Sequence, residues 1–433
     1  MDTKDGLRCS ADTAQVRPFW LRAFGFYGGA MLAVYLTGAI VVFAFLRYVG
    51  YPVSIVHVAL PPLWHRVVET RSWFFLNRSS QAFTKGNTSE GLLYLASAYE
   101  FDPGNYAAGM SLAKHFQVTQ PSRSDQVFEK LMRDHPDKRS ATAQDWFRAL
   151  LSRGSFERIS TLARDEILEA PAHGGVWLRA LFFATRQTGG DAPLRAILAA
   201  RTPQAQLWHP LIDIELLVRA GRKAEAIAAL NRPMPANATP FDLYYRIDTL
   251  IDLREIFPAL DLLGKYTTFL ARDPQAANTL LLKAYALGSS RSLVPQVETL
   301  LEQPFNASLA TLVSAHVIRY PNQQVFLKLW EKFQREPLPL TVDNVGAWFS
   351  VLCAAGAVGD QARLQEISAR LKQASATPFM GLTVVEAFFR GDSARKDAVS
   401  FLPILPLPMD VTYALFERYP TPGPGGRLRT PAR

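Results

Sequence analysis

The segment from Leu216 to Leu230 reads LLVRAGRKAEAIAAL: an apolar run ends in an Ala-Gly pair, a short charged cluster follows, and an alanine-rich run begins. A glycine at such a place permits the left-handed backbone conformation that ends many helices. The segment therefore predicts two helices joined by a tight turn at Gly221. Whether this hairpin occurs once or is one copy of a repeat decides the architecture of the chain.

Glycines that fit the same turn recur along the chain, with steps of 35, 32, 67, 68 and 35 residues. The two long steps are each close to two periods; Asn322 lies midway in the second, whereas the first has no such marker. Prolines that would stop or start helices follow a similar spacing, with steps of 30 to 41 residues. The glycines are Gly154, Gly189, Gly221, Gly288, Gly356 and Gly391, and the prolines are Pro103, Pro136, Pro171, Pro203, Pro233, Pro274, Pro304, Pro337 and Pro378. Both series indicate a repeat of about 34 residues.

This period resembles that of tetratricopeptide repeats (TPR), which is 34 residues. One stretch carries the resemblance best, with Gly91, Leu95, Ala98, Asp102-Pro103, Asn105, Leu112-Ala113 and Phe116. The opening segment fits at its Gly221 turn and at Ala226, while the other units are degenerate. HEAT-type arrays are an alternative with longer repeats. Pentatricopeptide repeats have a similar period, but the near-neutral body argues against their RNA-binding role.

The predicted fold is all-α: a right-handed α-solenoid of about eight to nine degenerate helical hairpins, preceded by one transmembrane helix. Each hairpin must stack on its neighbours, because one helix pair cannot bury its apolar face alone. Turns are predicted near residues 120, 154, 189, 221, 254, 288, 322, 356 and 391. The 41-residue proline steps predict insertions or atypical helices near 234–240 and 338–344.

Residues 24–46, FGFYGGAMLAVYLTGAIVVFAFL, form an uncharged run of 23 residues. As a helix this run would be about 34 Å long, enough to cross the hydrocarbon layer of a bilayer. It is longer than the apolar core of a cleavable signal peptide, which is about 7–15 residues. The alternative is a buried helix of a soluble fold. Gly25, Gly29 and Ala33 form a small-residue stripe that would permit self-association with a second membrane helix, although ordinary glycine usage explains it equally simply.

The basic residues next to this run predict its orientation. Arg17 and Arg22 lie close before it, whereas after Arg47 no Lys or Arg occurs until Arg66. The positive-inside rule therefore favours a cytoplasmic N-terminus. The expectation is a single-pass inner (cytoplasmic) membrane protein with a periplasmic solenoid.

The expected domain organisation follows from the membrane run and the repeat. Residues 47–85 contain Trp64, Val67, Val68 and Phe75 at helical spacing, which indicates a capping helix or, alternatively, an amphipathic helix on lipid headgroups. The predicted parts are an N-terminal tail at 1–23, the transmembrane helix at 24–46, the linker and capping or interfacial helix at 47–85, the TPR-like solenoid at 86–402, and a C-terminal cap with a disordered basic tail at 403–433.

The distribution of charge argues against nucleic-acid binding. The chain has a formal net charge of +9. Residues 1–85 carry nine Lys or Arg against four Asp or Glu, and residues 418–433 carry four Arg and no acid, which leaves the body near neutral. A nucleic-acid binder usually carries its basic excess on the folded body. We therefore expect no nucleic-acid partner.

Signatures of catalysis, cofactor binding and metal binding are absent from the sequence. It contains no GxSxG, HExxH, GxxxxGK[ST] or GxGxxG motif, and its seven histidines are scattered. Cys9 and Cys353 are far apart and form no CxxC or Cys/His metal spacing. The sequence therefore predicts a protein that is not an enzyme and has no catalytic, cofactor or metal residues.

Aromatic residues on the predicted first helices are the candidates for partner binding. In solenoids of the resembled family these helices line the concave face. The alternative is packing between helices, which is the usual role of aromatic stripes at helical spacing. The resemblance implies a membrane-anchored scaffold or assembly factor that binds other proteins or peptides for an envelope complex; the alternative is an accessory subunit of an envelope polysaccharide or secretion machine. The candidates are Trp146, Trp177, Trp208, Tyr245 and Trp348.

Overall fold

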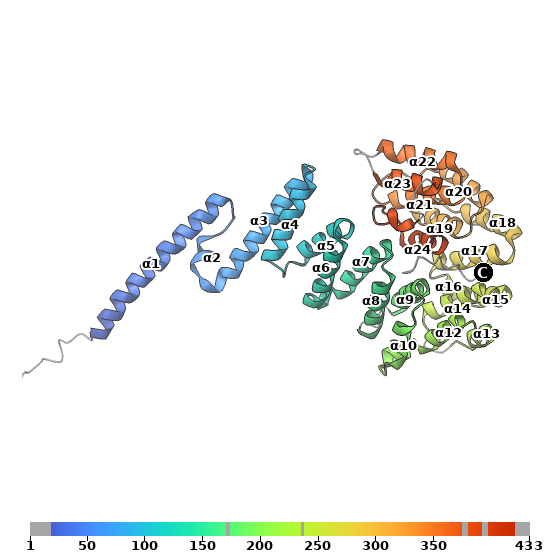
Figure 1. The fold of residues 1–433 in the computed structure, drawn as a ribbon, viewed down its shortest axis with the longest axis horizontal. Coiled ribbons are helices and arrows are strands. Elements are labelled where there is room, and N and C mark those ends of the chain that lie inside the picture. The colour runs from blue at the N-terminus through green and yellow to red at the C-terminus, as the bar shows by residue number, and fades with distance from the viewer. Residues whose placement is uncertain (1–18, 170–173, 235–237, 375–379, 392–396, 421–433) are drawn as a thin grey trace, which may run out of the picture. The chain divides into compact units, whose positions relative to one another are not determined.

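The structure, a computed structural model, describes residues 19–169, 174–234, 238–374, 380–391 and 397–420. All the regular secondary structure in these ranges is helical, and no strand occurs in them, which confirms the predicted all-α fold. The chain forms two compact units, residues 1–136 and 137–433 (Figure 1). Each is described by itself.

Unit 1 begins with α1, a helix of 31 residues. Within the described residues it is the one helix long and apolar enough to cross a membrane, by length and composition, over Arg22–Val49. Gly25 and Gly29 lie on α1 with open space where a side chain would extend. The helices of this unit are α1 (Phe19–Val49), α2 (Ile55–Ala59), η1 (Pro61–Leu63), α3 (Trp64–Thr84), α4 (Thr88–Phe101), α5 (Tyr106–Thr119) and α6 (Pro121–Asp134).

Small residues bring α3 and α4 close together. Ser72 Oγ donates to the carbonyl of Ala98 at 2.9 Å, and Ser79 Oγ donates to the carbonyl of Gly91 at 2.8 Å. A Cβ on Gly91 would lie 2.7 Å from the ring of Phe83, so only glycine fits this crossing without a shift. The predicted boundary between residues 85 and 86 therefore falls within a packed helix pair.

Unit 2 consists of helices that pack largely in chain order, as α7 on α8, α12 on α13, α14 on α15 and α19 on α20. Its helices are α7 (Arg139–Ser152), α8 (Phe156–Glu169), α9 (Gly174–Thr188), α10 (Ala192–Ala199), α11 (Pro203–Gln206), α12 (His209–Arg219), α13 (Lys223–Leu230), α14 (Pro240–Asp252), α15 (Ile256–Lys265), α16 (Thr267–Leu270), α17 (Pro274–Gly288), α18 (Ser290–Leu301), α19 (Ala307–Arg319), α20 (Gln323–Arg335), α21 (Val345–Ala357), α22 (Gln361–Ala374), α23 (Met380–Arg390), η4 (Ala398–Ser400) and α24 (Met409–Arg418).

The turn at Gly221 is built from a pair of backbone hydrogen bonds that recurs. Gly221 has a φ of 71°, and its N–H donates to the carbonyl of Val218 while the next N–H, of Arg222, donates to that of Leu217. This is the Schellman arrangement that closes a helix C-terminus. The same pair of bonds occurs at Gly154 and, in the gap that lacks a glycine, at Arg254, whose φ is 66°. A turn of the predicted period is therefore also present at Arg254, between Gly221 and Gly288, although no glycine marks it in the sequence.

Two of the six predicted turn glycines have a different role. Gly288 is the last residue of α17 and Gly356 lies inside α21, and neither has a positive φ. A side chain at Gly288 would collide with Ile256, and one at Gly356 would collide with the ring of Phe389. Both are close-packing residues, and the left-handed turn predicted near 356 is at Gly359, with a φ of 78°. The insertion predicted near 338–344 corresponds to the non-helical connection between α20 and α21.

The C-terminal helix α24 packs back onto α19 and α7 (Figure 1). Phe416 is fully buried, and its ring meets that of Phe156 at 5.1 Å. The ring of Tyr413 meets that of Phe183 of α9 edge to face, with ring centroids 4.5 Å apart. The C-terminal segment thus ties the first helices of unit 2 to α19. Most of the predicted disordered tail, residues 421–433, lies outside the described residues.

Candidate functional site

The five aromatic candidates are packing residues in this structure. None of them exposes more than 8% of its surface. Trp177 meets Phe147 edge-on at 5.7 Å, and the indole N–H of Trp348 donates to the carbonyl of Leu338 at 3.2 Å. The structure does not bring the five rings together on an exposed face. They are Trp146 on α7, Trp177 on α9, Trp208 just before α12, Tyr245 on α14 and Trp348 on α21.

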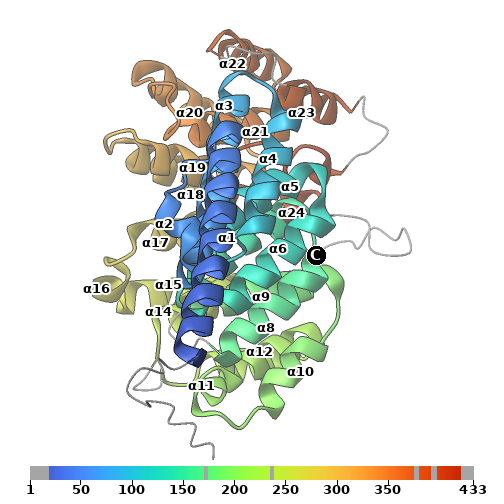
Figure 2. The same cartoon turned by 90° about the vertical axis from the view of Figure 1, so that its left-hand side faces the viewer.

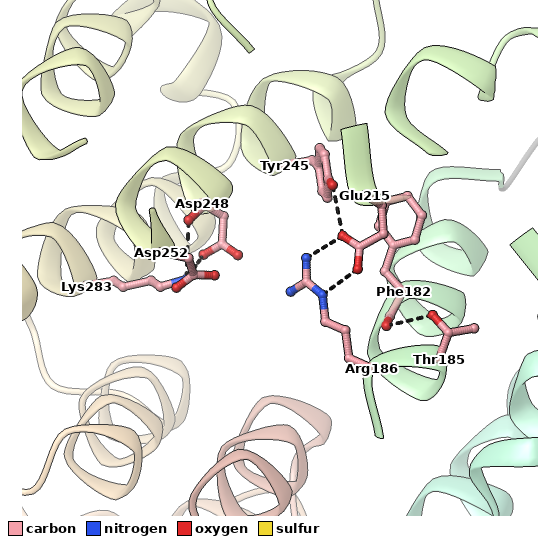
Figure 3. A network of polar contacts seen from close by, with 8 residues as sticks. All are labelled: Phe182, Thr185, Arg186, Glu215, Tyr245, Asp248, Asp252 and Lys283. Atoms are coloured by element: carbon pink, nitrogen blue, oxygen red, sulfur yellow. Dashed lines mark hydrogen bonds and ion pairs between the residues drawn. The ribbon is translucent and has the colours of Figure 1, made fainter. Parts of the chain in front are cut away.

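Tyr245 nevertheless leads to a cluster of charged residues that the sequence did not reveal. Its hydroxyl belongs to a set of polar side chains from four helices, α9, α12, α14 and α17, which face a common space (Figure 3). We call this set the inner polar row. Its members are Arg186, Glu215, Tyr245, Asp248, Asp252 and Lys283.

One end of the inner polar row is centred on Glu215, which is fully buried. Arg186 donates to both of its carboxylate oxygens, at 2.7 and 2.6 Å, and the Tyr245 hydroxyl donates to Oε2 at 2.9 Å. Burial and the Glu215 carboxylate raise the pKa of Tyr245 well above its usual range. Burial alone would lower the pKa of Arg186, but Glu215 outweighs it and raises that pKa. The bidentate pair compensates for the desolvation of a buried carboxylate.

The other end is centred on Lys283, whose Nζ lies 2.5 Å from Asp248 Oδ1 and 2.7 Å from Asp252 Oδ1. The two aspartates lie one helical turn apart on α14. Burial tends to raise the pKa of Asp248, but the Lys283 ammonium lowers it overall. Burial raises the pKa of Asp252, and the adjacent Asp248 carboxylate adds to the rise. Asp252 is therefore protonated more readily than Asp248.

The two ends of the row remain partly open to solvent. The side chains of Arg186 and Asp248 are each 38% exposed and that of Asp252 is 42% exposed, and they point toward the same space (Figure 3). Such side chains keep hydrogen-bonding capacity for a further partner while their own ion pairs fix their positions.

Two further ion pairs link α24 to α9, which belongs to the inner polar row, and to α19. Arg179 of α9 lies 2.9 Å from Asp410, and Arg319 of α19 pairs with Glu417. Arg319 also donates to the backbone carbonyl of Asp410 at 3.3 Å. These contacts join α24 to α9 and α19.

The spacing of these partners explains why they meet. Arg186 and Glu215 are 29 residues apart, Glu215 and Tyr245 are 30 apart, and Asp248 and Lys283 are 35 apart. Each interval is close to the period of about 34 residues predicted from the sequence. Opposite charges separated by about one period are the sequence signal that would have identified the row. When each helix is considered alone, its charged residue cannot be distinguished from an ordinary solvent-exposed charge.

The chemistry of the arrangement suits noncovalent recognition. Within the described ranges, no group of three or more His, Cys, Asp or Glu side chains is placed to hold a metal ion. Cys353 is fully buried in α21, and burial raises the pKa of its thiol, which disfavours the reactive thiolate. The inner polar row presents positively and negatively charged side chains at fixed positions.

Comparison with protein-family models, with curated proteins and with solved structures found no match for the chain.

Proposed function

We propose that this protein is a membrane-anchored helical-repeat scaffold that binds another protein without catalysing a reaction, as an assembly factor of an envelope complex. The body is a TPR-like, right-handed solenoid of eight to nine degenerate hairpins. The shared turn geometry at residues 154, 221, 254 and 359 and its near-34-residue period support this assignment.

The inner polar row is the observation that carries the binding proposal. It collects charged side chains from successive repeats, holds them by ion pairs, and leaves Arg186, Asp248 and Asp252 partly exposed. A partner segment with charges of both signs would find complementary groups at fixed positions. Such complementarity contributes mainly to specificity and to the rate of association.

The membrane anchor is α1, with the N-terminus in the cytoplasm and the solenoid on the periplasmic side. Its exposed apolar surface supports the anchoring, since Met31, Val34 and Phe45 are 77%, 75% and 63% exposed. The basic residues Arg17 and Arg22 support the orientation.

Affinity capture from detergent-solubilised membranes tests the binding proposal. The full-length chain is compared with the variant Asp248→Asn/Asp252→Asn, which removes two charges of the inner polar row. The control Glu331→Gln/Glu366→Gln removes the same charge from α20 and α22, where the two side chains are 57% and 41% exposed. The measurement is the amount of each co-purifying protein, with folding checked by circular dichroism.

The proposal expects at least one co-purifying protein whose amount falls about tenfold in the inner variant and is unchanged in the control. A tenfold loss corresponds to about 1.4 kcal/mol, within the range for losing one or two polar contacts. If the wild-type chain captures nothing, or if both variants capture equally, the inner polar row is not the binding surface.

A further inference from the structure

The chain reverses direction immediately after α1. The N–H of Tyr51 donates to the carbonyl of Leu46 at 2.9 Å, and α2 then packs beside α1 (Figures 1 and 2). The Tyr35 hydroxyl donates to the carbonyl of Ala59 at 2.8 Å. Residues 51–59 therefore run back along α1 as far as Tyr35.

This contact fixes how deep the returning segment reaches. Tyr35 lies 14 residues before Val49, the end of α1, a distance of about 21 Å at 1.5 Å per residue. It is also the middle residue of the uncharged run at 24–46. If that run crosses a bilayer, Ala59 lies near the middle of the hydrocarbon layer.

The composition of the returning segment fits such a depth. Between Arg47 and Arg66 the sequence contains no Asp, Glu, Lys or Arg. Within residues 51–64, the exposed large apolar side chains are Ile55, Val56 and Leu60, and Trp64 at the start of α3. In water these side chains would be an unfavourable exposed patch next to the equally exposed surface of α1. In lipid the two surfaces form one continuous apolar face.

The backbone of the segment meets the stricter requirement of a lipid environment, where unpaired N–H and C=O groups cost several kcal/mol each. The carbonyl of Val58 accepts from the indole N–H of Trp64 at 3.0 Å, and that of Ala59 accepts from Tyr35. The N–H of Leu60 donates to the carbonyl of Val56 at 3.1 Å. Pro61 and Pro62, which begin the short helix η1, have no N–H to satisfy.

The polar groups that remain are few. The Nδ1 of His65 lies 3.0 Å from the carbonyl of Pro62, and the Nδ1 of His57 has no hydrogen-bond partner among the described residues. Neutral histidine tolerates such a place better than a fixed charge does. The segment therefore has mostly apolar side chains, and most of its backbone polar groups discussed above are hydrogen-bonded or, at the prolines, absent.

The first turns of α3 mark the return to the membrane surface. Phe74 packs against Tyr51 with ring centroids 4.7 Å apart, so α3 regains the level of the end of α1 after about ten residues. Trp73 is exposed on this stretch, and Arg66 and Arg71 are the first cations. Exposed tryptophans and long basic side chains are typical of the interface between hydrocarbon and headgroups.

We propose that residues 51–64 form a re-entrant hairpin that enters the lipid bilayer beside α1 and exposes Val56 and Leu60 to lipid chains. This inference rests on the proposed crossing of the membrane by α1. It replaces a simple single-pass anchor with a two-part membrane domain, in which α1 crosses the bilayer and α2 enters and leaves from the side of the solenoid.

Site-directed spin labelling of the full-length chain in proteoliposomes tests the hairpin. In a Cys9→Ser/Cys353→Ala background, single cysteines are introduced by Met31→Cys, Leu60→Cys and Leu93→Cys, each at an exposed apolar residue on α1, at the end of α2 and on α4. The measurement is the collision rate of each label with oxygen, which concentrates in lipid, and with a water-soluble nickel chelate. The label at residue 93 is the matched control in unit 1.

We expect the labels at residues 31 and 60 to collide mainly with oxygen and the label at residue 93 mainly with nickel. Nickel access at residue 60, with residue 31 in lipid, would overturn the hairpin and leave the α1 anchor intact. Low access to both probes at residue 60 would show that protein rather than lipid covers it, and would also reject the proposal. Nickel access at residue 31 would remove the membrane crossing itself.

Discussion

Gly221 and Arg254 adopt nearly the same backbone conformation, with φ of 71° and 66°, although one lacks a side chain and the other carries a guanidinium. The left-handed region costs an ordinary residue roughly 1–2 kcal/mol, so Arg254 needs compensation. Its Nη1 donates to the carbonyl of Leu287, 33 residues further along the chain, at 2.9 Å. A contact with α17 thus accompanies the strained turn between α14 and α15.

The conformation at Gly221 gives a prediction that separates backbone strain from crowding. Gly221→Ala should lower the free energy of unfolding by about 1 kcal/mol, although no atom lies within 4 Å of the added Cβ. Gly264→Ala in α15 has equally open space but no positive φ, and should be neutral or stabilising by up to about 1 kcal/mol. Urea unfolding of both variants measures the difference. Equal effects would mean that the turn is not held in the left-handed conformation.

His316 on α19 provides a prediction about pH. It is buried, its Nε2 has no partner among the described residues, and burial together with Arg319 lowers its pKa to about 3 from an ordinary value near 6.5. Below pH 6.5 the unfolded chain binds a proton that the folded chain does not, so this residue costs stability as the pH falls from 6.5 toward 3. At pH 5 the cost is about 2 kcal/mol.

Replacing this imidazole should therefore flatten the dependence of stability on pH. His316→Gln should lose about 2 kcal/mol less than the wild-type chain between pH 7 and pH 5, whatever its stability at pH 7, because glutamine does not titrate. The measurement is the urea midpoint at each pH, and a slope unchanged by His316→Gln would contradict the buried neutral imidazole.

At the scale of the helices, a glycine has two uses that the sequence does not distinguish. Gly154 and Gly221 end helices, as predicted, because their conformation requires φ above zero. Gly356 belongs to the same period but is a packing residue, since the ring of Phe389 occupies the space of its Cβ. The period could be read from the sequence because turns and close crossings both recur once per repeat. The role of each glycine depends on its neighbour in the next repeat and could not be read.

The C-terminal helix α24 gives a prediction at this scale. Phe416→Ala should destabilise unit 2 by about 3–5 kcal/mol, because it empties a fully buried site where α24 meets Phe156. Phe257→Ala on α15 is the matched control, since that ring is 87% exposed, and its effect should stay within about 0.5 kcal/mol. Denaturant unfolding measures both. Similar small effects for the two variants would show that α24 does not contribute to the core.

For the whole molecule, local sequence signals predicted the helices but not the contacts between distant segments. The sequence predicted a C-terminal cap from residue 403 onward, yet nothing in that segment shows that Asp410 will meet Arg179, 231 residues earlier. The inner polar row escaped prediction for the same reason, because Glu215 looks like a solvated helix residue until the fold brings Arg186 and Tyr245 to it. Both features arise from contacts between helices that are far apart in the sequence rather than from any one element.

The orientation of the whole chain is the last property open to a direct test. Arg17 and Arg22 precede the apolar run of α1, so the positive-inside rule predicts that the solenoid is exported. Alkaline phosphatase fused after Arg433 should then be active in a bacterial host, because its disulfides form only in an oxidising compartment, and green fluorescent protein fused at the same place should be dark. The same fusions to a chain that begins at Gly50 lack α1 and should reverse both signals. A fluorescent fusion of the full-length chain would place the inner polar row in the cytoplasm, and its partner would then have to be sought there.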